Sequence, residues 1–161
     1  MTVDIDIEIA SAENDNKLGE AVIREVRRYG QFTIFDDAGA IVKNGRVVLF
    51  GFVTQPHKKE RLEERMHKVL GIIEFRNEIV VLPNSMNDTN LRRTHANRLY
   101  RDSLFADFAT MALPPINIIV QNSRVLLTGI VHNQLAKAKA EHLLRSTPGI
   151  LGFESRLRID K

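Results

Sequence analysis

Two stretches of the chain alternate hydrophobic and polar positions in almost the same order. The first, "VKNGRVVLFGFV", covers residues 42–53, and the second, "VQNSRVLLTGIV", covers residues 120–131. Alternation with period two is typical of a half-buried strand, and Asn-Gly between two such runs is the strongest short-range indication of a β-hairpin. The sequence therefore predicts one hairpin twice, 78 positions apart.

Apolar residues at helical spacing predict a helix in front of each hairpin. The apolar stripes are Leu18, Val22 and Val26 in the first copy and Leu91, His95 and Leu99 in the second. Asp88 or Thr89 is expected as the N-cap of the second of these helices. The two helices align at a spacing of 73, so the second copy carries about five extra residues before its hairpin.

A second helix and a third strand are predicted behind each hairpin. Pro56 suits the first turn of the helix in the first copy, and Gly71 and Gly149 are expected to end the two helices as C′ residues. The segments 75–82 and 153–159 then have the pattern of strands. Each copy is thus predicted to be a helix, two strands, a helix and a strand, with a small three-stranded mixed sheet packed on two helices.

The domain organisation follows from the repeat. We expect an α+β protein with a first unit at residues 13–83, a linker at 84–87 and a second unit at 88–161. Residues 1–12 stand outside the repeat. There Val3, Ile5, Ile7 and Ile9 alternate with acids, which predicts an N-terminal strand on an open sheet edge, in this molecule or in a neighbour.

Three details of the hairpins bear on the fold. Asn122-Ser123 replaces Asn44-Gly45, and because Ser tolerates positive φ less well than Gly, the second turn is expected to be strained or of another type. Gly51 and Gly129 indicate a bulge or the close approach of another backbone. Val48, Phe50 and Phe52 make the outer side of the first hairpin apolar, so we expect the other copy or a protein partner to cover it.

The repeat resembles the BON domain, a family named for bacterial osmotic-stress and nodulation proteins. The residues that carry the resemblance are Asn44, Gly45, Gly51 and Gly71 in the first copy and Asn122, Gly129 and Gly149 in the second. The resemblance implies an αββαβ fold in a tandem protein of the bacterial periplasm or cell envelope. It also implies binding to anionic phospholipid and support of envelope integrity under osmotic stress. The matching residues identify the fold and carry no binding site across.

Charge and composition narrow the classes of function. The sequence has no Cys, and residues 1–16 hold five acids and no base, which leaves 23 bases against 15 acids, or +8, on the rest. A basic body suggests an anionic partner, although a charge of this size also serves solubility. No apolar run is long enough to cross a membrane, and the N-terminus lacks a basic leader. Either a leader has been removed or the protein stays in the cytoplasm.

No catalytic or metal site is apparent. The five histidines show no metal-ligand spacing, and His95 lies on the apolar stripe of its helix, where a packed core residue is expected. We therefore expect no enzyme, no cofactor and no metal. "GILG" at 149–152 has the GxxG spacing of KH domains but joins a helix to a strand, so we do not expect nucleic acid as a partner.

The candidate lipid-binding surface lies between Leu91 and Pro115, where arginines accompany aromatic and aliphatic side chains. Its residues are Arg92, Arg93, Arg98, Arg101, Phe105, Phe108, Met111 and Leu113. Such a mixture suits an interface at which phosphates attract the cations and apolar side chains insert. In the competing interpretation the aromatic residues belong to the core and the arginines solvate the helix. The alternative function is a protein-interaction or scaffold module, a homo-oligomer included, that assembles through sheet edges and exposed apolar sheet faces.

Overall fold

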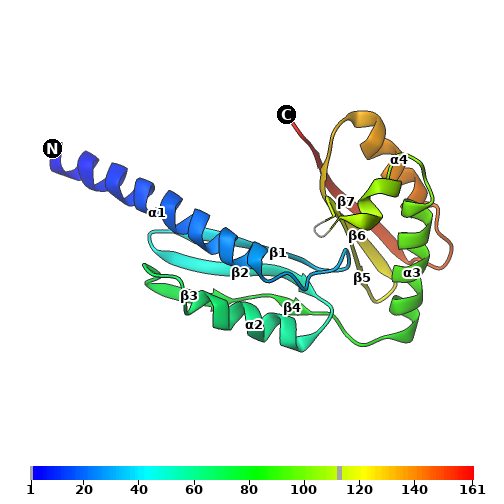
Figure 1. Cartoon of the computed structure of the whole chain (residues 1–161), viewed down its shortest axis with the longest axis horizontal. Helices are drawn as coiled ribbons and strands as arrows, with labels where there is room; N and C mark the ends of the chain where they lie inside the picture. Colours follow the sequence, from blue (N-terminus) through cyan, green and yellow to red (C-terminus); the bar gives the residue numbers. More distant parts are fainter. Residues whose placement is uncertain (1, 112–113) are drawn as a thin grey trace. The chain divides into compact units, whose positions relative to one another are not determined.

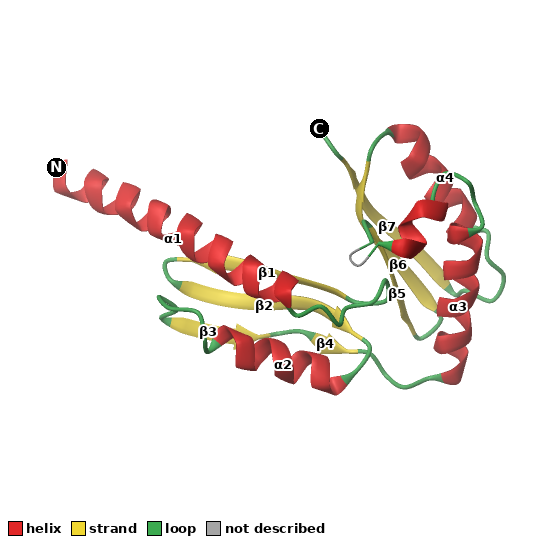
Figure 2. Cartoon of the chain, in the orientation of Figure 1, coloured by secondary structure: helices red, strands yellow, loops and turns green. Residues whose placement is uncertain are grey.

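The chain forms two compact units in a computed structural model, which describes residues 2–111 and 114–161, with side chains from residue 13 onward (Figure 1). The first unit comprises the chain up to Gln31 together with Ala38–Val81, and the second comprises Phe32–Asp37 together with Leu82–Lys161. Each unit combines helices with a small mixed sheet (Figure 2), which confirms the predicted α+β class.

The first unit contains two helices and four strands. They are α1 (Thr2–Arg28), β1 (Asp37–Lys43), β2 (Arg46–Val53), α2 (Pro56–Met66), β3 (Glu74–Asn77) and β4 (Val80–Val81). The strand order is β1-β2-β3, and β4 also pairs with β2. Both β3 and β4 run parallel to β2, with Val47 opposite Phe75 and Phe52 opposite Val80. These two strands are the predicted third strand, interrupted once.

The second unit repeats this arrangement with a continuous last strand. Its elements are α3 (Met86–Tyr100), the short 3-10 helix η1 (Ala106–Thr110), β5 (Ile116–Gln121), β6 (Arg124–Val131), α4 (Gln134–Arg145) and β7 (Gly152–Ile159). The sheet order is β5-β6-β7, antiparallel between β5 and β6 and parallel between β6 and β7. The five extra residues predicted before this hairpin fall between the end of α3 and the start of β5.

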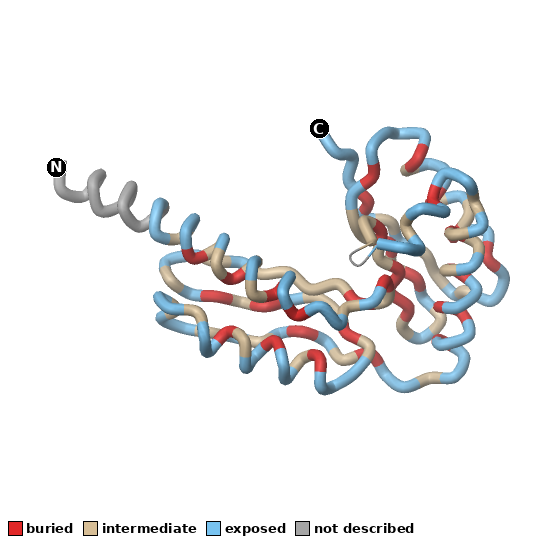
Figure 3. Tube along the Cα trace, viewed as in Figure 1, coloured by how far each residue is buried: buried red, intermediate tan, exposed pale blue. Residues whose placement is uncertain are grey.

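Each unit has its own core between the helices and one face of the sheet (Figure 3). In the first unit Val22 and Val26 of α1 are buried, as are Leu49 of β2 and Leu62 of α2. In the second unit α3 contacts β5 and α4, and α4 contacts β6 and β7. The predicted stripe Leu91, His95 and Leu99 is buried there, which confirms the helical pattern.

The predicted N-terminal strand is wrong, because α1 runs from Thr2 to Arg28 as one helix. An established helix adds residues at little cost, whereas a strand needs a partner edge. Side chains before residue 13 lie outside the described part.

Helix ends also differ from the predictions. Ser85 is the N-cap of α3, and its Oγ accepts a hydrogen bond from the Asp88 N–H at 3.2 Å, so the helix begins earlier than expected. The helices α2 and α4 end at Met66 and Arg145, several residues before Gly71 and Gly149. The two glycines have φ of 96° and 89° in the turns that follow the helices.

The glycine late in the second hairpin marks the close approach of another backbone, as predicted. Gly129 has φ of 123°, and a Cβ at this position would overlap the Pro115 carbonyl oxygen. This oxygen accepts a hydrogen bond from the Ile130 N–H at 3.0 Å. The residue in front of β5 therefore lies directly against the main chain of β6.

Candidate functional site

An aspartate of the first helix of each unit binds the turn of the following hairpin. The Asp15 carboxylate accepts hydrogen bonds from the Asn44 and Gly45 N–H groups at 2.7 and 2.9 Å. Asp88 accepts the corresponding bonds from Asn122 and Ser123 at 2.9 and 2.8 Å. Sequence reasoning missed this contact, although 15 and 88 differ by the spacing of 73 at which the helices align.

The residues that carry the family resemblance share one backbone property. All have positive φ: Asn44 51°, Gly45 74°, Gly51 119°, Gly71 96°, Asn122 51°, Gly129 123° and Gly149 89°. Ser123 also has a positive φ of 62°, so the second turn keeps the conformation of the first and is strained, not of another type. These residues shape the backbone at the turns and at the close approach of neighbouring chain segments.

The candidate surface begins on α3, where the structure separates the four arginines. Arg92 is buried, and its Nη2 donates a hydrogen bond to the Val120 carbonyl at 2.7 Å. Burial lowers the pKa of Arg92, while the negative charges of Asp88 and Asp36 raise it. Arg92 thus links α3 to the sheet from inside and is not available at a surface.

The other three arginines lie closer to solvent. Arg93 and Arg101 are exposed and lie eight residues apart, a little more than two helical turns. Arg98 is half-buried, and it donates to the Leu143 carbonyl at 3.1 Å and to Ser146 Oγ at 3.0 Å, which ties α3 to α4. The arginines that can meet an external anion are therefore Arg93 and Arg101.

The apolar residues behind α3 also divide into core and surface. Phe105 is buried, and Phe108 packs against the same core with its ring centroid 5.7 Å from that of Phe105. Met111 is 46% exposed and Leu104 is 44% exposed, and Leu104 was not among the predicted residues. Leu113 lies outside the described residues. The remaining apolar surface follows Arg101 directly in the sequence.

An ion pair fixes the loop that carries these residues. Asp102 accepts a hydrogen bond from the Leu104 N–H at 3.0 Å and pairs with Lys139 of α4 at 3.0 Å. Both contacts lower the pKa of Asp102, the backbone hydrogen bond more than Lys139. The carboxylate therefore stays charged and keeps Leu104 in a defined position at the end of α3.

His95 is a core residue, as the apolar stripe predicted. Its side chain is fully buried, and its Nδ1 lies 2.7 Å from the Leu91 carbonyl oxygen. Burial is the main cause that lowers the pKa of His95 and favours the neutral ring. Among the described residues, no group of three or more His, Asp or Glu side chains is placed to hold a metal ion. Within the same residues, no helix is long and apolar enough to cross a bilayer.

The solved structures that are similar to this chain include two structures of CdsD, a structural protein of the type III secretion system of Chlamydia trachomatis. One aligns at 14% identity and a TM-score of 0.36, and covers 88% of this chain and 63% of the other. The C-terminal domain of the same protein aligns at 13% identity and a TM-score of 0.36, with 79% and 58% covered. This chain thus spans less than two thirds of either structure. No curated protein matches the sequence.

The comparison with protein families gives a match for the second unit. Residues 88–160 match the BON domain, and the match begins at Asp88, which binds the hairpin turn, and ends just behind β7. The order α3, β5, β6, α4, β7 is the αββαβ order that the sequence resemblance implied. Residues 88–160 of this chain therefore match the BON domain both in sequence and in the order of their helices and strands.

Proposed function

We propose that the chain is a non-enzymatic protein that binds anionic phospholipid surfaces through its BON domain. One observation carries the proposal: Arg93 on α3 and Arg101 at its C-terminal end are exposed, and the half-exposed apolar residues Leu104 and Met111 follow them in the sequence. Basic side chains beside apolar ones suit the boundary between headgroups and acyl chains. Phospholipid binding is also what the BON family suggests.

The electrostatic contribution of this surface sets the expected affinity. Each Lys or Arg near an anionic leaflet contributes about 1 kcal/mol, and salt screens this attraction within a Debye length. Two arginines alone give weak binding, so the apolar side chains Leu104 and Met111 have to contribute as well. A peripheral, reversible association follows, in the bacterial periplasm or cell envelope, where it supports envelope integrity under osmotic stress.

Sedimentation with vesicles tests the proposal. The full chain should sediment with phosphatidylglycerol vesicles at low salt, dissociate at high salt and ignore phosphatidylcholine vesicles. Reversal of both arginines (Arg93→Glu with Arg101→Glu) should weaken binding at least roughly tenfold. The matched control reverses Arg156 and Arg158, which are exposed on β7 of the same unit. Equal loss in both variants, or no vesicle binding by the parent protein, would contradict the α3 surface as the site.

We further propose that the first unit is a second copy of the same domain, with boundaries at about residues 13–83. Its elements follow the same order, and Asp15 binds its hairpin turn as Asp88 binds the other. The family match itself covers only residues 88–160.

An exposed apolar sheet face favours a second candidate function, a protein-interaction module. Ile41, Phe50 and Val80 of the first sheet are 59%, 44% and 41% exposed. Val80 pairs with Phe52, and a Cβ on Gly39 would touch the Phe50 ring, so these side chains share the face opposite the core. Sedimentation velocity of Phe50→Ser tests this function: a lower mass than that of the parent would support assembly through this face.

A further inference from the structure

The first unit contains a basic cavity of about 450 Å³ that the lipid-binding proposal does not use. Two residues behind α1, Tyr29 and Gln31, line one side of it. Four basic side chains of α2 and of the turn behind it line the other side: His57, Arg61, Arg65 and Lys68. All of these residues belong to the first unit.

The basic residues follow the helical repeat. His57, Arg61 and Arg65 are spaced four apart, so they lie on one side of α2, and Lys68 continues the row in the next turn. Like charges four residues apart oppose helix formation. An anion in the cavity would offset the repulsion between Arg61 and Arg65.

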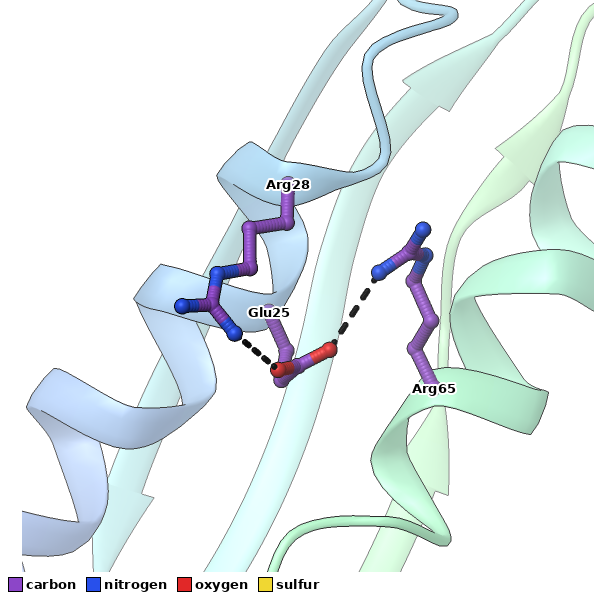
Figure 4. Close-up of polar contacts among 3 residues, drawn as sticks. All are labelled: Glu25, Arg28 and Arg65. Carbon is purple, nitrogen blue, oxygen red and sulfur yellow. Dashed lines mark hydrogen bonds and ion pairs between the residues drawn. The ribbon is translucent and has the colours of Figure 1, made fainter.

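Arg65 is held in place before any ligand arrives. Its Nη1 lies 3.2 Å from Glu25 Oε2, and its guanidinium carbon lies 5.8 Å from the centroid of the Tyr29 ring. Figure 4 shows Glu25 between Arg65 of α2 and Arg28 of α1, and it pairs with Arg28 at 3.5 Å. Two arginines therefore share one carboxylate, and Glu25 does not cancel the positive charge. A fixed side chain loses less entropy on binding than a free one.

The carboxylate inside the cavity opposes an anion only weakly. Glu64 pairs with Arg61 at 3.1 Å, but both side chains are more than 60% exposed. Exposed pairs of this kind contribute little to stability, so a multiply charged anion can replace Glu64 as the partner of Arg61. Within the described residues Lys68 makes no ion pair, and Arg61, Arg65 and Lys68 exceed Glu64 in charge.

The second unit shows that the fold does not require these cations. At the spacing of 78, the residues at the positions of His57, Arg61, Arg65 and Lys68 are Leu135, Lys139, Leu143 and Ser146. The one cation that remains, Lys139, is paired with Asp102 at 3.0 Å. The same helix thus folds without the row, which indicates that the row serves a ligand of the first unit.

We propose that this cavity binds a phosphate group, with Arg61 and Arg65 as the main donors and Lys68 as an additional charge. The planar guanidinium of Arg matches the oxygens of a phosphate and can donate two parallel hydrogen bonds. The phosphate belongs either to a small free anion or to a phospholipid headgroup. This site is independent of Arg93 and Arg101, so it does not rest on the vesicle-binding proposal.

The test follows the backbone amide NMR shifts of Arg61, Arg65 and Lys68 in the full chain at constant ionic strength. One arm adds inorganic phosphate, and the other adds soluble short-chain phosphatidylglycerol below the concentration at which it forms micelles. We expect a saturating shift that Arg61→Gln with Lys68→Gln weakens roughly tenfold in affinity. Gln keeps the helix propensity of the parent residues. The matched control, Lys17→Gln with Lys43→Gln, removes two exposed charges elsewhere in the first unit.

The two arms separate the sources of the phosphate. Saturation with inorganic phosphate assigns the site to a free anion, and saturation with the lipid alone assigns it to a headgroup. Saturation with neither, or the same loss in the control variant, would overturn the site. Vesicle sedimentation of the same cavity variant should match the parent if the ligand is a free anion, because Arg93 and Arg101 are unchanged, and should weaken if the ligand is a headgroup.

Discussion

At the scale of single residues, one carboxylate compensates for an unfavourable backbone conformation in the second unit. Ser123 has φ of 62°, a conformation that costs a non-glycine residue on the order of 1 kcal/mol. Asp88 is almost fully buried and accepts hydrogen bonds from both turn amides, and such bonds to a charged group each contribute about 1.5–3 kcal/mol. Because Asp88 favours the turn in this way, the second hairpin can keep Ser where the first has Gly45.

A buried histidine makes the stability of the second unit dependent on pH. Burial lowers the pKa of His95 from 6.5, and it outweighs the backbone hydrogen bonds of Leu91 and Leu144, which raise the pKa. Below about pH 6.5 the unfolded chain binds a proton that the folded core rejects, so stability falls as the pH falls, by at most about 1.4 kcal/mol per pH unit. Above pH 6.5 this contribution is constant. Urea unfolding between about pH 8 and pH 5 measures it.

The variant His95→Val isolates this contribution, because Val22 occupies the corresponding buried position in the first unit. We expect His95→Val to lose stability less steeply than the parent as the pH falls. The control His132→Val removes an exposed histidine and should keep the parent's slope. Equal slopes in parent and His95→Val would show that the folded core accepts the proton.

At the scale of elements, the sequence pattern predicts the helices and strands that pack against other elements of the same repeat unit. The stripe Leu18, Val22 and Val26 is buried as predicted, because the apolar side of an amphipathic helix packs on the core of the protein. The alternation Val3 to Ile9 was misleading, since a strand also needs a free edge, which local sequence does not reveal. The contact of Asp15 and Asp88 with the turns was equally hidden, because it joins residues about 30 positions apart.

The candidate site was predictable only in part for the same reason. The sequence places Arg92, Arg93, Arg98 and Arg101 close together on or next to one helix, but it does not show in which direction each side chain points. Arg92 points inward because its guanidinium donates a hydrogen bond to the Val120 carbonyl and is attracted by the charges of Asp88 and Asp36. This arrangement exists only after β5 has packed on α3. Leu104 becomes a surface residue because Asp102 holds its N–H.

A substitution of Gly129 tests whether the second hairpin needs the close approach of β6 to the Pro115 main chain, and a substitution of Gly19 serves as the comparison. Gly129→Ala would place a methyl group on the Pro115 carbonyl at φ of 123°, and we expect it to lower the free energy of unfolding by more than about 2 kcal/mol. Gly19→Ala lies on α1 with no atom within 4 Å of its Cβ, so it should raise stability by up to about 1 kcal/mol. Urea unfolding of both variants provides the comparison. A neutral Gly129→Ala would mean that the chain before β5 can move away.

At the scale of the whole molecule, the two units are not simply consecutive in sequence. Phe32–Asp37 leads from α1 into the first residue of β1 but belongs to the second unit. The Ile34 carbonyl accepts a hydrogen bond from the Ile118 N–H of β5 at 2.7 Å, and the Ile34 side chain is part of the core cluster of that unit. The repeat could not reveal this, because matching positions in two copies do not show on which unit a connecting segment packs.

The segment is shaped for this position by its own hydrogen bonds. The carboxylate of Asp36 accepts from the Thr33 N–H at 2.8 Å and from its Oγ1 at 3.0 Å, which closes a turn around Ile34. Asp36 is itself buried, and its charge favours the buried guanidinium of Arg92. Residues 88–160, which match the BON domain, thus gain an apolar side chain, a main-chain acceptor and a negative charge from a segment more than 50 residues earlier in the chain.

Truncation of Ile34 should therefore weaken the second unit, although the residue precedes the first hairpin. Ile34→Ala removes a buried side chain, and a loss of roughly 2 kcal/mol is expected. Hydrogen exchange provides the measurement: the Ile118 amide should exchange faster in Ile34→Ala, while amides of β2 in the first unit should keep the parent's rates. The control Ile41→Ala truncates an exposed isoleucine of β1 and should leave Ile118 unchanged. If Ile118 stays equally protected in Ile34→Ala, the BON domain is complete without this segment, and the close packing of Ile34 contributes nothing to its stability.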